Sequence, residues 1–254
     1  MNKLCIFCDG RVNSEEHIWP QWLLKLIKKW PSENMRMHAA RLNKHGTIDR
    51  WKTPSPAIVV NCVCTRCNNG WMSDLEQNAR PILTPLIDGT AKKITFSEQM
   101  TIAAWATKCA IVFDGMESGE SFYEQSDRLH FREDLIPPID YTEFWIGHYA
   151  GPSLWACTIH GPGINKVSRT PNKSYVQTMI FGRFILQFVS IRPLTTAIVP
   201  VINIQVKNGP WTKVAVGLFA HNGGSMNWPP EHSFDNSSCT FQDFADRFGL
   251  KGLD

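Results

Sequence analysis

The alternation of apolar and polar residues predicts a helix near the start of the chain. The segment from Ser14 to Trp30 begins polar and turns apolar from Ile18. Pro20 fits the first turn of a helix, and Pro31 ends it. The apolar residues after Pro20 recur at helical spacing, and three lysines take the opposite face. These are Trp22, Leu23, Leu26, Ile27 and Trp30, against Lys25, Lys28 and Lys29.

A strand and a second helix are predicted further along the chain. Residues 32–56 are mostly polar, with two prolines, which is typical of a loop or a short hairpin. Residues 57–64 are rich in β-branched side chains and predict a strand. After Gly70, apolar residues repeat at intervals of four, which predicts a helix that ends before Pro81. These residues are Trp71, Leu75 and Ala79.

The rest of the sequence predicts one more helix and then mainly strands. Thr95 and Glu98 form a capping box ahead of a helix that reaches Val112. A short terminal helix is predicted over Thr240–Phe248. Glycine and proline separate several of the strand-like segments. These segments are Phe144–Tyr149, Leu154–His160, Val176–Arg192, Ala197–Val206 and Lys213–Leu218.

This order of elements favours an α+β fold over a parallel, doubly wound one. We predict two domains, one over residues 1–90 and one over residues 91–254. The second is expected to be a mainly antiparallel α+β domain whose role the sequence does not indicate.

The placement of the eight cysteines indicates a metal site rather than disulfides. Cys5 and Cys8 form one C-x-x-C pair, and Cys64 and Cys67 form another. Two residues between ligands allow one tight turn to direct both thiolates at a single ion, so the two turns predict a closed, structural zinc site with four cysteine ligands. A redox pair is the alternative, but it needs only one C-x-x-C and usually lies near a βαβ pattern, which this sequence lacks. Cys62 is an alternative ligand.

Charge and composition narrow the class of protein. A hydrophobic content of 43% and a charged content of 19% are ordinary for a globular protein. The sequence has no apolar run long enough to span a bilayer and no secretory signal, so a cytoplasmic location is expected. Residues 1–110 hold 15 Lys and Arg against 9 Asp and Glu, although the whole chain carries only +3. This asymmetry favours a polyanionic partner for the first part.

A polar motif lies between the two cysteine pairs, and a second motif follows them. The first is Ser14-Glu15-Glu16-His17-Ile18-Trp19-Pro20, and the second is Asn68-Asn69-Gly70-Trp71. Over about residues 5–80 this order resembles the HNH endonuclease superfamily with its zinc-bearing ββα-metal finger. The resemblance implies that His17 is the general base and that Glu16 and Asn68 hold a catalytic Mg²⁺ or Mn²⁺. Asn69 is the reserve for Asn68. Members commonly carry a further asparagine before the second pair, and Asn61 is the candidate here, although it lies closer to Cys64 than usual.

These residue types suit phosphodiester hydrolysis. A hard divalent ion prefers oxygen ligands such as a carboxylate and an amide carbonyl. An imidazole, which titrates close to neutral pH, can take a proton from water. In a regular strand, however, Glu16 and His17 point to opposite faces, so a bulge or turn is needed for both to serve one phosphate.

Three hypotheses follow from the sequence. The first is a metal-dependent endonuclease that acts on DNA, with RNA as the alternative substrate. The second is a non-catalytic zinc module that binds nucleic acid. The third is an interaction protein in which residues 91–254 bind a partner or form a homodimer. None of them involves a membrane.

Overall fold

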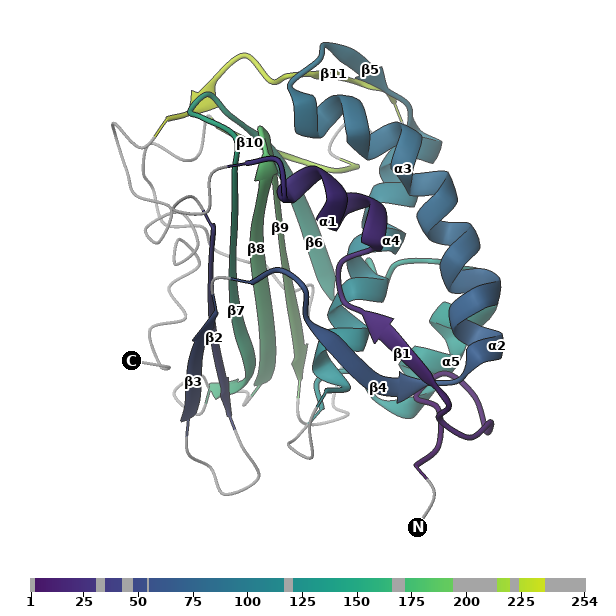
Figure 1. Ribbon diagram of the computed structural model, residues 1–254. Coiled ribbons are helices and arrows are strands. Elements are labelled where there is room, and N and C mark those ends of the chain that lie inside the picture. The colour runs from purple at the N-terminus through teal and green to yellow at the C-terminus, as the bar shows by residue number, and fades with distance from the viewer. Residues whose placement is uncertain are drawn as a thin grey trace.

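The computed structural model describes residues 3–30, 35–42, 48–53, 55–116, 121–165, 172–193, 214–219 and 224–235. The protein is a mixed α+β structure, as predicted (Figure 1). The helical elements are α1 (Gln21–Ile27), α2 (Thr65–Cys67), the π-helical turn η2 (Asn68–Met72), α3 (Ser73–Asp88), α4 (Phe96–Asp114) and α5 (Gln125–Asp134).

The strands fall into one large sheet and two small pairs. Their bounds are β1 (Ser14–His17), β2 (Met35–Leu42), β3 (Ile48–Thr53), β4 (Val59–Val63), β5 (Lys92–Ile94), β6 (Thr142–Tyr149), β7 (Leu154–Asn165), β8 (Asn172–Gly182), β9 (Phe184–Pro193), β10 (Ala215–Gly217), β11 (Met226–Trp228) and β12 (Ser233–Phe234). The large sheet has the order β10-β6-β9-β8-β7-β2-β3, and β12 also pairs with β6. Only the β2–β7 and β12–β6 pairings are parallel among the described strands of this sheet.

The large sheet joins early and late parts of the sequence. Strands β2 and β3 form the short hairpin that was one alternative for residues 32–56, and β2 is hydrogen-bonded to β7. The sheet therefore includes strands from both sides of residue 90. A domain boundary at that residue stays a prediction.

Helices cover one face of this sheet (Figure 1). Helices α3 and α4 pack on each other, and α3 also contacts β8 and β9. The capping box of Thr95 and Glu98 is confirmed at the start of α4. From Ile102 onward α4 is buried on every side, as expected of a helix that is apolar all round. Trp105 of α4 and Trp19, which precedes α1, both contact Phe181 of the sheet. One hydrophobic core thus connects the N-terminal segment, the helices and the sheet.

The prediction that the second helix ends before Pro81 is wrong. Helix α3 continues through Pro81 and Pro85 to Asp88. A proline inside a helix costs about 3 kcal/mol because it removes a hydrogen bond and crowds the preceding turn. The two prolines together cost about 6 kcal/mol, whereas the four large apolar side chains that the added turns bury are together worth roughly 6–12 kcal/mol, which offsets this cost. The four are Ile82, Leu83, Leu86 and Ile87.

The strand predicted over Val176–Arg192 is in fact two antiparallel strands, β8 and β9. The chain reverses at Gly182, whose φ of 61° is a left-handed conformation that glycine adopts without strain. A Cβ at this position would also lie 2.5 Å from the carbonyl oxygen of Ile87. Helix α5 was not predicted. The segments Ala197–Val206 and Thr240–Phe248 lie outside the described residues.

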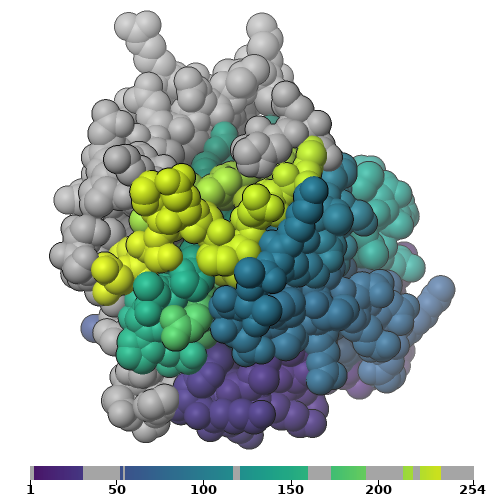
Figure 2. All heavy atoms as spheres, turned by 90° about the horizontal axis from the view of Figure 1, so that it is seen from above, coloured from purple at the N-terminus to yellow at the C-terminus, as the bar shows by residue number. Residues whose placement is uncertain are grey.

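The two small strand pairs lie at the ends of the helical layer. Strand β1 pairs with β4, and β5 pairs with β11. Seen from above, residues 224–235, drawn in yellow, lie against the end of α3 and β5, drawn in blue (Figure 2). Among the described helices, none is both long and apolar enough to cross a bilayer.

Candidate functional site

The four predicted metal ligands lie together. The sulfur atoms of Cys5, Cys8, Cys64 and Cys67 are all within 4.8 Å of one another. The Cys8 sulfur is 3.5 Å from that of Cys64 and 3.7 Å from that of Cys67. Four sulfurs bound tetrahedrally at about 2.3 Å would be separated by about 3.8 Å, close to these distances. This group could hold a metal ion. The alternative ligand Cys62 is buried and lies outside the group.

The environment of the cluster affects its thiols unequally. Burial raises the pKa of Cys5 and of Cys67. Burial also acts to raise the pKa of Cys64, but hydrogen bonds from the Cys67 backbone and from neighbouring thiols outweigh it, so that its pKa falls to about 7. The Gly10 amide donates to the Cys8 sulfur, and a Cβ on Gly10 would approach that sulfur to 3.3 Å. A glycine after the first turn therefore leaves room for the sulfurs.

Strand β1 runs beside this cluster and carries the predicted acid and base. Ser14 lies opposite Val63, but Glu16 lies opposite Val60, so the register shifts by one residue between them. The extra residue lies on β4, and Glu16 and His17 face Val60 and Val59 in regular register, so the shift falls before the acid–base pair and not between its two members. Glu16 is buried, and His17 is half-buried.

A pocket of about 430 Å³ opens between β1, the start of α1 and the η2–α3 segment. We call it the Glu16–His17 pocket. It is lined by Ser14, Glu15, Glu16, His17, Pro20, Gln21, Trp22, Asn68, Asn69, Ser73 and Glu76. The structure thus brings Glu16, His17 and Asn68 to one pocket, together with Asn69. Asn61 lies exposed on β4 and does not line the pocket, so its bracing role stays a prediction.

Asn68 is fixed in orientation by β1. Its amide nitrogen Nδ2 donates to the Ser14 hydroxyl at 2.8 Å and to the Glu15 carbonyl oxygen at 3.1 Å. These bonds use the donor end of the amide. Within the described part of the chain, no hydrogen bond occupies Oδ1. The oxygen of Asn68 is therefore the end left for a further partner.

Two residues of the site were missed by the sequence interpretation. The ammonium group of Lys108, on α4, lies 2.9 Å from Glu16 Oε1 and 2.6 Å from Glu76 Oε1. Lys108 is fully buried, and Glu76 also lines the Glu16–His17 pocket. The signal in the sequence was a single lysine within the apolar run from Ile102 to Val112. A charge in such a run is almost never buried unless it is paired.

Lys108, Glu16 and Glu76 are close enough to affect one another's pKa values. Burial acts to lower the pKa of Lys108, but the neighbouring Cys109, Glu16 and Glu76 side chains reverse this effect, so its pKa lies above the usual value and it stays charged. Burial raises the pKa of Glu16, and Lys108 opposes that rise. With both carboxylates ionised the trio carries a net charge of −1, which leaves the pocket attractive to a further cation.

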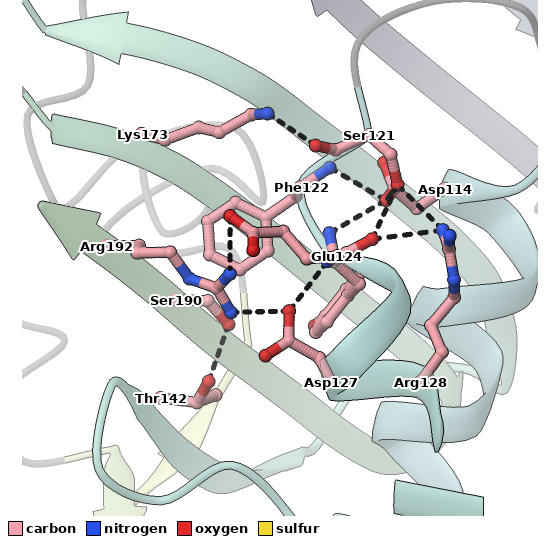
Figure 3. Close-up of polar contacts among 11 residues, drawn as sticks. Asp114, Ser121, Phe122, Glu124, Asp127, Arg128, Thr142, Lys173, Ser190 and Arg192 are labelled. Atoms are coloured by element: carbon pink, nitrogen blue, oxygen red, sulfur yellow. Dashed lines mark hydrogen bonds and ion pairs between the residues drawn. The ribbon is translucent and has the colours of Figure 1, made fainter. Parts of the chain in front are cut away.

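A second polar cluster lies at the start of α5 and has a structural explanation (Figure 3). The Asp114 carboxylate, at the end of α4, accepts the backbone amides of Phe122 and Tyr123. The Arg192 guanidinium, on β9, lies 2.6 Å from the Asp127 carboxylate. These contacts connect the segment before α5 to α4 and to the sheet. Helix α5 is thereby held in place beside the cysteine cluster, where Phe131 packs on Trp71.

Comparisons of this chain with protein-family models, with characterised proteins and with solved structures give no match.

Proposed function

We propose that this protein is a metal-dependent endonuclease of the HNH type, which hydrolyses phosphodiester bonds in DNA. The observation that supports it best is the Glu16–His17 pocket. There an imidazole, a buried carboxylate and an oriented asparagine from two distant segments of sequence line one hollow. The pocket lies beside a cysteine cluster that suits a structural zinc ion. We therefore assign Cys5, Cys8, Cys64 and Cys67 to zinc.

The residues of the pocket fit a divalent ion. Lys108 contacts Oε1 of Glu16 and Oε1 of Glu76, so the second oxygen of each carboxylate is left for an ion. The hydrogen bonds of Asn68 use its Nδ2 and likewise leave its Oδ1 for an ion. Oxygen donors of this kind are those that Mg²⁺ and Mn²⁺ prefer. Glu16 and Asn68 would hold the ion.

The proposed reaction is attack of water on phosphorus with departure of the 3′ oxygen. His17 takes a proton from the attacking water as the new P–O bond forms and the bond to the 3′ oxygen breaks. The departing oxygen takes a proton from solvent. When bound, the divalent ion neutralises charge on the phosphate and on the leaving oxygen. Lys108 favours the ionised form of Glu16 and holds the carboxylate in position.

Cleavage of plasmid DNA with Mg²⁺ or Mn²⁺ tests this function. We expect the wild-type protein to nick or cut the plasmid, and His17→Ala to lose at least about 100-fold in rate, a typical effect of removing a general base. His130→Ala is the matched control, because His130 is exposed on α5 and does not line the Glu16–His17 pocket. Equal cutting by wild type and His17→Ala, both folded and zinc-loaded, would remove His17 from the mechanism.

The ion pair between Lys108 and Glu16 favours one alternative, a zinc module that binds nucleic acid without cutting it. In that case Glu16 is a buried structural acid whose charge Lys108 already balances. The same assay separates the two functions. A protein that binds DNA but leaves it intact with every divalent ion would be the binding module.

A further inference from the structure

A stripe of polar residues runs along α2, η2 and α3. Arg66, Asn69, Ser73, Glu76 and Arg80 follow one another at alternating intervals of three and four residues. The last three share one face of α3. The first two precede a kink at Gly70, whose φ of −95° and ψ of −119° are not helical. The three central residues line the Glu16–His17 pocket. The two end residues are arginines. One arginine thus precedes the pocket-lining residues in sequence, and the other follows them.

The Arg66 end opens into a second hollow of about 490 Å³ beside the cysteine cluster. Arg11 and Arg132 line it as well, so three segments of the chain each contribute one arginine, against the single carboxylate of Asp9. The Arg132 guanidinium donates to the Phe7 carbonyl oxygen. Among the described residues, none of the three arginines is within 4.0 Å of a carboxylate or bonded to a cysteine sulfur. Their charge thus faces the hollow.

The Arg80 end lies beside α1. The guanidinium carbon of Arg80 is 6.0 Å from the centre of the Trp22 ring, and Trp22 forms part of the Glu16–His17 pocket. The side chain of Arg80 is exposed. It can therefore contact a ligand that extends out of the pocket on this side.

The pocket between these two ends is acidic. Glu15, Glu16 and Glu76 line it, and only Lys108 offsets them among the described residues. A phosphate chain crosses such a pocket only if cations on both sides attract it, because the carboxylates alone would repel it.

We propose that the stripe is a binding track for the phosphodiester backbone of nucleic acid, with phosphates at Arg66 and Arg80 on opposite sides of the Glu16–His17 pocket. Arg11 and Arg132 extend the track at the Arg66 end. Arg66 and Arg80 lie 14 positions apart in sequence, on either side of the kink at Gly70. The proposal rests on the proposed function for the position of the phosphate that reacts, but the track is measurable without cleavage.

The test is the salt dependence of binding by His17→Ala protein without added divalent ion. Fluorescence anisotropy with a labelled 20-base-pair DNA duplex gives Kd between 50 and 200 mM salt, and an RNA duplex of the same sequence shows which nucleic acid is held. Arg66→Gln and Arg80→Gln are each introduced into this background. Lys93→Gln is the control, because Lys93 is exposed on β5, away from both hollows.

Each lost phosphate contact lowers the slope of log Kd against log salt by about 0.9. Between 50 and 200 mM salt, the Kd of the parent should therefore rise by a factor about three times larger than the Kd of each arginine variant. The Kd of Lys93→Gln should rise by the same factor as that of the parent. Unchanged slopes for Arg66→Gln or for Arg80→Gln would overturn the track. If His17→Ala stops cutting but the arginine variants keep the parent's slope, the nuclease function is supported and the binding track is wrong. If the arginine variants have reduced slopes but the wild-type protein never cuts DNA, the binding track is supported and the nuclease function is wrong.

The zinc content of Arg66→Gln separates binding from metal retention. A zinc ion with four thiolates carries a formal charge of −2, which a nearby guanidinium partly balances. We expect a full zinc complement in this variant. Loss of zinc, with binding restored when zinc is resupplied, would show that Arg66 serves the metal site and would overturn its place in the track.

Discussion

The ammonium nitrogen of Lys108 lies 2.9 Å from a carboxylate oxygen of Glu16, although 92 residues separate the two in sequence. This contact connects the middle of α4 to the short strand that also carries His17. It shows that the Glu16–His17 pocket is completed by a helix from beyond residue 90. A fragment that ends before α4 would lack the cation between Glu16 and Glu76.

Replacement of Lys108 should destabilise the fold strongly. Lys108→Met leaves two carboxylates close together without their shared cation, and breaking a buried ion pair in this way costs about 3–5 kcal/mol. Urea denaturation at pH 7 measures the free energy of unfolding. The exposed residue Lys93, changed to Met, should stay within about 0.5 kcal/mol of wild type.

The deficit of Lys108→Met should shrink in acid. Burial already raises the pKa of Glu16, and loss of the lysine raises it further. A carboxyl group with a raised folded-state pKa stabilises the fold below its unfolded pKa of about 4.3, and this stability is lost as the pH rises through the folded-state pKa. The gap to wild type should therefore narrow between about pH 7 and pH 4. A gap that is constant over this range would show that lost packing, rather than charge, is responsible.

The sequence predicted the features that depend on local pattern. The four metal ligands follow from two C-x-x-C turns, and the sulfurs do lie together in a group that could hold an ion. The start of α4 follows from the Thr95 capping box, which is confirmed. The mixed α+β class follows from the order of helical and strand-like segments. Each of these predictions starts from a recognisable pattern in the sequence, although the two cysteine turns lie 56 residues apart.

The features that the sequence did not predict depend on distant contacts. Helix α3 continues through Pro81 because later turns bury apolar side chains against other elements. The pairing of β2 with β7 has no local signal. Lys108 could be recognised as unusual in its apolar run, but only the fold shows which carboxylates surround it. The register shift ahead of Glu16 is likewise a product of the pairing of β1 with β4.

The cysteine cluster should lose its metal when a single ligand is changed. Cys64→Ser should lower the zinc per chain, measured by elemental analysis, and the melting temperature together, because a small metal-bound unit derives folding energy from the ion. Cys62→Ser is the matched control, since Cys62 is buried two residues away but outside the group of four. A full zinc complement in Cys64→Ser, or its loss in Cys62→Ser, would show that the ligand set is wrong.

Metal affinity should rise steeply with pH near neutrality. Burial raises the pKa of Cys5 and of Cys67, so both thiols must lose protons when a metal binds. Cys64, whose pKa is about 7, contributes less above that pH. Release of about two protons or more makes the zinc affinity rise by at least about 100-fold for each pH unit between 7 and 8. Competition with a chromophoric chelator measures this slope, and a slope near zero would contradict a thiol ligand set.

Asn68 and Asn69 should differ sharply when each is changed to aspartate. Asn68→Asp replaces the amide that donates to Ser14 and to the Glu15 carbonyl with a group that cannot donate, next to a strand that already carries two glutamates. We expect a loss of about 1–3 kcal/mol in stability, since acceptors are left unpaired and like charges are brought together. Asn69→Asp changes the same atoms one residue later, on an exposed side chain, and should cost less than about 0.5 kcal/mol.

Binding of Mn²⁺, followed by its electron paramagnetic resonance signal, should weaken in Asn68→Ala and stay unchanged in Asn69→Ala if Asn68 is the ligand. The opposite order would transfer that role to Asn69, because both asparagines line the same pocket.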